Sequence, residues 1–115
     1  MSVHRHSFGK EKRLRKKRDI DALFANASRI SLGGITLRYA KNGLVCNRIA
    51  IANGRRWGSA AERNRVRRIA REVFRVWPGK ANGRVDILLT QYRVLRDVPG
   101  KEIAERVRRL FDRIL

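Results

Sequence analysis

Arginine side chains at helical spacing are the groups in this sequence whose types and positions could do chemistry, and that chemistry is the binding of a polyanion. They lie in the stretch 59–77, which carries the signals of a single helix. Ser59 and Glu62 form a capping box, in which each side chain accepts a hydrogen bond from the backbone of the other. Pro78 ends the helix because proline disfavours helical backbone in the residue before it.

The predicted helix has one apolar face and one basic face. At about 100° per residue, the apolar arc holds Val66, Ile69, Ala70, Val73, Phe74, Val76 and Trp77. The opposite arc holds Asn64, Arg67, Arg68, Arg71 and Arg75, with Arg63 and Arg65 toward its two edges. Only Glu62 and Glu72 oppose these arginines, and unpaired like charges at helical spacing repel each other. A solvated basic face is the alternative, but the surplus of charge favours a polyanionic partner.

The overall charge indicates the same kind of partner. The chain has 115 residues, enough for one domain with a modest core, and a formal net charge of +19. Arginine outnumbers lysine 22 to 7, and its guanidinium can pair two donors with a phosphate and stack on a base. No apolar run is long enough to span a membrane, the start lacks the apolar segment of a signal peptide, and the one cysteine is Cys46. We therefore expect a cytoplasmic protein that binds nucleic acid.

The sequence offers no set of residues for catalysis by the protein itself. It has no nucleophile-and-base motif, no phosphate-binding glycine loop and no Cys/His cluster with the spacing of a metal site. Its two histidines, His4 and His6, lie in the basic block 1–17, which we expect to be a mobile or loosely docked arm of the single domain 1–115. We therefore predict no catalytic and no metal-binding residue.

Helical and strand patterns alternate along the rest of the chain. Apolar spacing predicts a helix at about 18–27, a strand at 35–40, a second strand at 44–52, a buried strand at 85–90 and a last helix around 103–114. Asn42-Gly43 is a strong signal for a two-residue hairpin between the first two strands. Strict pairing across that turn would place Ile49 and Ile51 on the face opposite Ile35 and Leu37, so a bulge, a looser turn or a sheet covered on both sides stays open. The order predicts an α+β layer fold.

The helix 59–77 and its approach resemble a known family. Arg56-Trp57-Gly58 followed by Arg63-Asn64-Arg65-Val66-Arg67-Arg68 is similar to the signature of the bacterial ribonuclease P protein component. The segment 8–19, with Phe24 after it, resembles the N-terminal part of the same family. Size, charge and element order also agree, so the resemblance covers nearly the whole chain.

The resemblance implies a fold and a function. The family folds as an α-β sandwich with a small mixed sheet and a left-handed crossover through the central helix. Its members are protein subunits of a ribonucleoprotein endoribonuclease, in which a catalytic RNA removes the 5′ leader of precursor tRNA. Mg²⁺ ions bound mainly by that RNA carry the chemistry, so the implied partners are ribonuclease P RNA and the precursor tRNA leader, with no membrane. The oligomeric state stays unknown.

The resemblance also implies two surfaces on this chain. The surface for the catalytic RNA would consist of Arg63, Asn64, Arg65, Arg67, Arg68 and Arg71. A cleft between the first helix and the sheet would hold the single-stranded leader, lined by Arg15, Phe24, Tyr39, Arg55 and Arg56. Aromatic faces and cations are the groups that sequence-tolerant binding of a single strand requires.

Some residues depart from the family pattern, and other functions stay open. Ile20 stands where the family usually has Phe, Ala52-Asn53-Gly54 replaces a stretch that carries two serines, and Trp57 replaces a frequent aliphatic residue. The main alternative is a ribosomal or other structural RNA-binding protein with no role in cleavage. A DNA-binding chromatin protein and a self-sufficient nuclease rank lower.

Overall fold

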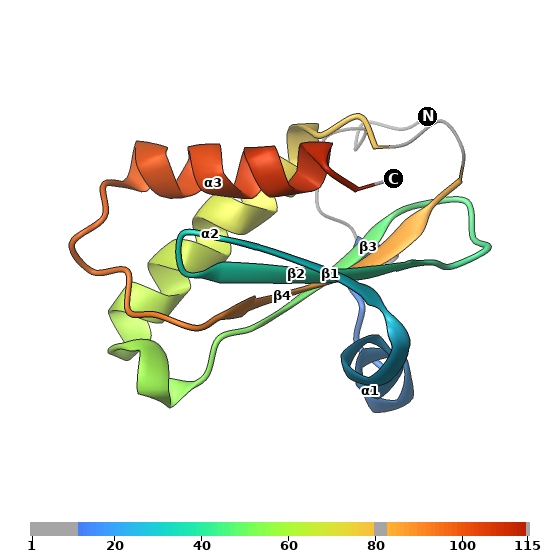
Figure 1. Cartoon of the computed structure of the whole chain (residues 1–115), viewed down its shortest axis with the longest axis horizontal. Coiled ribbons are helices and arrows are strands. Elements are labelled where there is room, and N and C mark those ends of the chain that lie inside the picture. Colours follow the sequence, from blue (N-terminus) through green and yellow to red (C-terminus); the bar gives the residue numbers. More distant parts are fainter. Residues whose placement is uncertain (1–11, 80–82, 115) are drawn as a thin grey trace.

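A four-stranded mixed sheet with helices on both faces forms the molecule (Figure 1). A computed structural model describes residues 12–79 and 83–114. In chain order the elements are α1 (Lys17–Asn26), β1 (Ser28–Leu32), β2 (Ile35–Lys41), β3 (Arg48–Ala52), the 3-10 turn η2 (Arg55–Trp57), α2 (Ala60–Val76), β4 (Val85–Gln91) and α3 (Gly100–Asp112). The strand order is β1-β2-β4-β3, and α2 connects the parallel neighbours β3 and β4. The predicted α+β class and element order are confirmed.

The hairpin of the sheet is not the one that Asn42-Gly43 predicted. The strand β1, which the sequence analysis missed, pairs antiparallel with β2 across Gly33-Gly34, and both glycines have positive φ. β2 and β3 do not pair, because β4 lies between them, antiparallel to β2 and parallel to β3. The predicted hairpin at Asn42 is therefore wrong. The strand expected at 44–52 begins only at Arg48.

The position of β4 between β2 and β3 also explains how Ile49 and Ile51 can share a sheet face with Ile35. In parallel register Ile49 and Ile51 lie beside Ile87 and Leu89, on the side of the sheet where Ile35 and Leu37 are buried. Asn42 closes a longer loop with its side chain: its amide nitrogen donates to the Cys46 carbonyl at 3.1 Å, and its amide oxygen accepts from the backbone of Leu44 at 2.8 Å. Asn42-Gly43 therefore lies in a longer loop between β2 and β3, and not in a tight hairpin turn.

The main core lies between the sheet and the helices α2 and α3. From α2 it receives Val66, Ala70, Val73 and Phe74, and from α3 it receives Ile103, Val107, Leu110 and Phe111. These are residues of the predicted apolar faces, since helical spacing brings them onto one side. The prediction is wrong for Val76, which is 56% exposed near the end of α2.

A smaller core lies on the other face of the sheet, beneath α1. Leu14 and Leu23 pack there on Leu88 of β4. Of the predicted N-terminal arm, residues 12–16 are docked, because Leu14 is buried and its backbone nitrogen donates to the Ile49 carbonyl at 2.9 Å. The remainder of the arm, residues 1–11, lies outside the described residues. α1 occupies one end of this face, below the sheet in Figure 1.

An ion pair connects β3, β4 and α1 at the edge of the smaller core. Arg48 donates two hydrogen bonds to the Asp86 carboxylate, at 2.8 and 2.7 Å, and its guanidinium lies 3.5 Å from Asp19 of α1. The hydrogen bonds from Arg48 to Asp86 raise the pKa of Arg48. Asn42 also donates to Asp86 at 2.9 Å, so the carboxylate joins the loop 42–47 to the sheet.

We expect Asp86→Ala to lower the free energy of unfolding by about 2 to 3 kcal/mol, because it removes the carboxylate that accepts both hydrogen bonds of the Arg48 guanidinium. Urea denaturation measures this difference. The exposed Asp97→Ala is the control and should change it by less than about 0.5 kcal/mol. Equal effects of the two variants would contradict a structural role for the pair.

Candidate nucleic-acid interface

The helix α2 begins with the predicted capping box. The Ser59 hydroxyl accepts from the backbone of Glu62 at 3.2 Å, and the Glu62 carboxylate accepts from the backbone of Ser59 at 2.8 Å. Glu62 also accepts a hydrogen bond from Arg96 at 2.8 Å. The bond from Arg96, with a smaller contribution from Ser59, lowers the pKa of Glu62. The carboxylate is therefore occupied by the helix start and by Arg96, and it does not pair with the arginines of α2.

The predicted RNA-binding residues of α2 form a surface that we call the α2 basic face, which consists of Arg63, Asn64, Arg65, Arg67, Arg68 and Arg71. Two of its arginines are half-buried and bind backbone carbonyls. Arg63 donates to Gly58 at 3.2 Å, and Arg65 donates to Val98 at 2.6 Å. A carbonyl orients a guanidinium without cancelling its charge. Within the described part of the chain, no carboxylate forms an ion pair with Arg63, Arg65, Arg67 or Arg68.

A buried asparagine that the sequence analysis did not identify as a site residue holds Arg67. Asn53 is fully buried, and its amide oxygen accepts from Arg67 at 2.8 Å. Its amide nitrogen donates to Gln91 at 2.7 Å and to the Arg63 carbonyl at 3.1 Å. Because Asn53 follows β3 and Gln91 ends β4, this network fixes the first turns of α2 to the sheet. Its only sequence signal was the departure from the family pattern at this position.

Farther along α2 the arginines differ in their surroundings. Arg68 and Arg71 are exposed. Desolvation and the nearby positive charges of Arg13 and Arg67 lower the pKa of Arg71. Arg75 forms an ion pair with Glu72, which neutralises the predicted basic arc at this position. Among the described residues, the arginines of α2 that have no carboxylate partner are thus Arg63, Arg65, Arg67 and Arg68.

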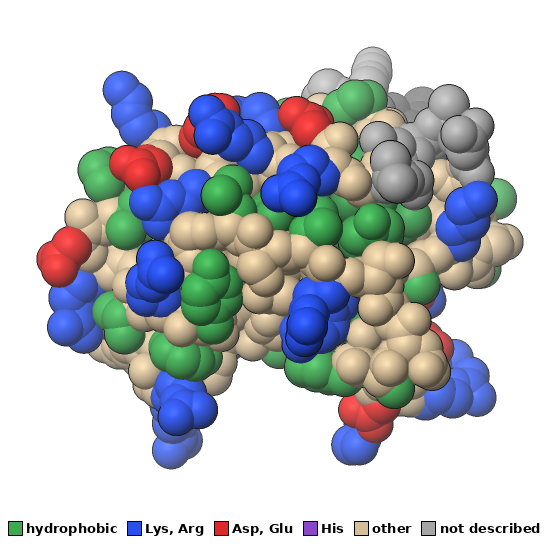
Figure 2. Space-filling view, viewed as in Figure 1, with side chains coloured by type: hydrophobic (Ala, Val, Ile, Leu, Met, Phe, Trp, Pro, Cys, Tyr) green, Lys and Arg blue, Asp and Glu red, His purple; other side chains and the backbone are tan. Residues whose placement is uncertain are grey.

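A cleft of about 600 Å³ lies beside α1, on the face of the sheet that points away from the main core. Its lining consists of Phe24, Arg29, Ser31, Thr36, Arg38, Ala52, Trp57, Thr90, Gln91 and Tyr92. No acidic residue lines it, and the lining combines three aromatic rings with two arginines. Basic side chains are also spread over the whole surface seen in Figure 2, where acidic ones are fewer.

The structure brings together only some of the residues predicted for the leader cleft. Phe24 lines the cleft, is 52% exposed and has the Arg38 guanidinium 4.9 Å from its ring centre. Arg55 and Arg56 lie on η2, exposed and next to the lining residue Trp57.

Two predicted cleft residues lie elsewhere. Tyr39 shares the sheet face of Ile35 and Leu37 and packs on the main core, so its placement in the cleft is wrong. Arg15 lines a separate hollow of about 360 Å³ together with Arg71, so it does not join Phe24 either.

Among the cleft residues that the sequence did not predict, Arg29, Arg38 and Tyr92 carry a charge or an aromatic ring. Strand alternation contained a signal for Arg38, because a residue between Leu37 and Tyr39 must point away from the main core.

The fold and the two surfaces define a small arginine-rich α+β protein with a basic helical face and an aromatic cleft supported by one sheet. Residues 8–115 match the family model described as Ribonuclease P. The ribonuclease P protein component of Thermotoga maritima is 30% identical over 104 residues, which cover 90% of this chain and 82% of that protein. The protein component of Dictyoglomus thermophilum is 36% identical over 70 residues, 61% of this chain and 58% of that protein. The chain therefore belongs to the ribonuclease P protein family.

Solved structures agree with this assignment. The RNase P protein from Thermotoga maritima in complex with 1-(4-fluorophenyl)-2-thiourea superposes with a TM-score of 0.79 at 29% identity, covering 90% of this chain and 100% of that chain. A Staphylococcus aureus RNase P protein shares the fold at 19% identity, with a TM-score of 0.78 over 88% of this chain and 93% of that chain. The β3-α2-β4 crossover that carries the α2 basic face belongs to this shared fold.

Within 12–79 and 83–114, no three His, Cys, Asp or Glu side chains gather where they could hold a metal ion. Among the same residues no helix has the length and apolar character to cross a membrane.

Glu62 gives a prediction about acid sensitivity. Because its pKa is lowered from the ordinary value of 4.5, the folded protein binds this proton more weakly than the unfolded chain. Ionised Glu62 therefore contributes stability above that value, and the contribution is lost as the pH falls through the lower folded pKa. Urea midpoints of the wild type and Glu62→Gln should differ near neutral pH and converge on acidification. A difference that stays constant with pH would contradict this role.

Proposed function

We propose that this chain is the protein subunit of ribonuclease P and assists the endonucleolytic removal of the 5′ leader from precursor tRNA. The α2 basic face would bind the catalytic RNA, and the cleft beside α1 would bind the single-stranded leader. The observation that carries the proposal is the state of Arg63, Arg65 and Arg67, which are oriented by neutral oxygens and form no ion pair with a described carboxylate, so that their charge is left for a polyanion. The proposed partners are thus two RNA molecules in the cytoplasm, and no membrane takes part.

The two surfaces suit different forms of RNA. Guanidinium groups held in fixed directions can match the phosphates of a folded RNA, whose backbone has a defined shape. The cleft offers rings for stacking and cations for phosphates, which is the combination that binds single strands with little dependence on sequence. Because different residues form the two surfaces, one protein can bridge the catalytic RNA and its substrate.

The proposal assigns the protein no catalytic residue. We place Mg²⁺ mainly on the RNA, as the family resemblance implies. When bound there, Mg²⁺ would activate the attacking water and stabilise the departing 3′ oxygen. The arginines of this chain would reduce the repulsion between the two polyanions and hold the leader in place.

Cleavage of precursor tRNA by a bacterial ribonuclease P RNA, at a Mg²⁺ concentration too low for the RNA alone, tests the function. Adding the protein should restore cleavage at the mature 5′ end. Unchanged cleavage would overturn the proposal and favour a ribosomal or other structural RNA-binding protein. Protein that cleaves without the RNA would also overturn it, because the activity would then be its own.

We expect Arg68→Ala to weaken binding to the catalytic RNA and to reduce the slope of log affinity against log salt by about one, since one phosphate contact is lost. Arg68 is the best position for this test because its side chain is exposed, whereas Arg63 and Arg65 also stabilise the fold through their bonds to backbone carbonyls. Arg109→Ala on α3 removes the same charge outside the α2 basic face and should leave the slope unchanged. Matching slopes for the two variants would mean that only net charge matters.

We expect Phe24→Ala to weaken binding of precursor tRNA by about fivefold or more, because one stacking face in the cleft is lost. The loss should vanish when the leader is shortened to one nucleotide. Tyr39→Phe is the control, since Tyr39 packs on the core and the ring is retained. A loss of affinity that is independent of leader length would place Phe24 outside the leader site. Equilibrium binding to the reconstituted complex measures both.

A further inference from the structure

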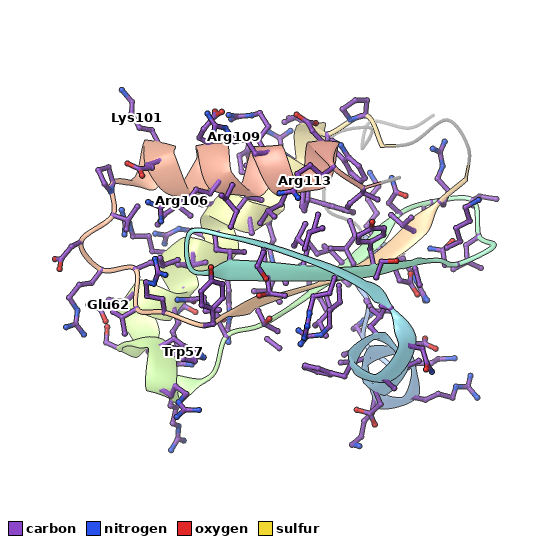
Figure 3. The ribbon with its side chains drawn as sticks, in the orientation of Figure 1. Trp57, Glu62, Lys101, Arg106, Arg109 and Arg113 are labelled. Atoms are coloured by element: carbon purple, nitrogen blue, oxygen red, sulfur yellow. The ribbon has the colours of Figure 1, made fainter. Side chains whose placement is uncertain are left out.

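The end of the cleft away from α1 carries two aromatic residues that the family resemblance does not assign. We propose that Trp57 and Tyr92 form a second base-stacking subsite for single-stranded RNA, separate from Phe24. Both residues line the cleft. Trp57 lies on η2, and η2 and α1 occupy opposite ends below the sheet (Figures 1 and 3). The subsite rests on the proposed function, because it would bind another part of the same leader.

Backbone hydrogen bonds hold the main chain that carries both rings before any RNA binds. The Trp57 nitrogen donates to the Gly54 carbonyl at 3.1 Å, which closes the η2 turn. The Tyr92 nitrogen donates to the Gly34 carbonyl at 2.9 Å, which holds the residue after β4 against the β1-β2 turn. Trp57 is half-buried and Tyr92 is 43% exposed, so each is anchored and still accessible. Anchored rings lose little conformational entropy when a base stacks on them.

Each ring is accompanied by a cation. The Arg56 guanidinium lies 5.3 Å from the centre of the Trp57 ring, and the Arg93 guanidinium lies 5.4 Å from that of Tyr92. Both arginines are exposed and form no ion pair with a described carboxylate. Each can therefore reach a phosphate beside a base stacked on the ring. The same pairing occurs at Phe24 and Arg38, so the motif repeats at both ends of the cleft.

The polar groups of the floor favour stacking over the recognition of base edges. Both ends of the Gln91 amide form hydrogen bonds within the protein: its oxygen accepts from Asn53 at 2.7 Å, and its nitrogen donates to the Arg93 carbonyl at 3.0 Å. The Ser31 and Thr36 hydroxyls bond to each other at 2.8 Å. With these groups engaged internally, the rings and arginines are the main contacts left for RNA. Only an unpaired strand can present base faces to them, so the occupant is a single strand, and the proposed function makes that strand RNA.

The test measures equilibrium binding of precursor tRNAs with graded leader lengths to the holoenzyme reconstituted from the protein and the catalytic RNA. Trp57→Leu and Tyr92→Leu remove the ring but keep apolar bulk, whereas Trp57→Phe and Tyr92→Phe keep a ring and are the matched controls. Each Leu variant should weaken binding of long-leader substrates by about tenfold, and each Phe variant by less than about twofold. With a one-nucleotide leader all variants should bind equally. The loss should also set in at a different leader length from that of Phe24→Ala.

Equal affinities of the Leu and Phe variants, or a loss that persists with the shortest leader, would overturn the subsite. These outcomes are distinct from failure of the proposed function, in which wild-type protein would not stimulate cleavage at all. In that case, binding of a single-stranded oligoribonucleotide to the protein alone decides about the subsite. RNA should quench wild-type tryptophan fluorescence, and Trp57→Phe, which keeps Trp77, should lose the quenching. Equal quenching in both proteins would overturn the subsite.

Discussion

The contacts of the α2 arginines with neutral oxygens are the interactions on which the account of this protein depends. Arg63 and Arg65 donate to backbone carbonyls, and Arg67 donates to the side-chain amide of Asn53. Such contacts fix the direction of a guanidinium and leave its positive charge in place. A carboxylate would neutralise that charge, as Glu72 does for Arg75. The positive side chains of α2 therefore repel one another in the free protein, and an anion bound along the helix reduces that repulsion.

The strand β4 allows the sheet to support a different surface on each face. It is buried along most of its length, with Ile87 and Leu89 in the main core and Leu88 in the smaller core beneath α1. The main core holds α2 and so determines where the basic face points. On the other face α1 covers only part of the sheet, and the uncovered part becomes the cleft. The Asn53-Gln91 pair lies between these regions, because it binds Arg67 of α2 while Gln91 lines the cleft floor.

Much of this fold could be predicted from local patterns, and the failures have specific physical causes. The capping box and the continuous apolar run of β4 depend on neighbouring residues, and both predictions were confirmed. The Asn42-Gly43 hairpin failed because a turn signal cannot register that a strand about forty residues later will insert between its two arms. The Gly33-Gly34 hairpin was overlooked because β1 is short and mostly exposed. Tyr39 was misplaced although alternation with Leu37 already put it on the core side.

The central claim is that the α2 basic face and the cleft bind two different RNA molecules. Photo-crosslinking from a photoreactive residue at Asn64, on α2, or at Ser31, in the cleft, tests it most directly in the reconstituted complex with precursor tRNA. The account predicts crosslinks from position 64 to the catalytic RNA alone and from position 31 to the 5′ leader alone. Crosslinks from both positions to the same RNA, or from position 64 to the leader, would contradict it.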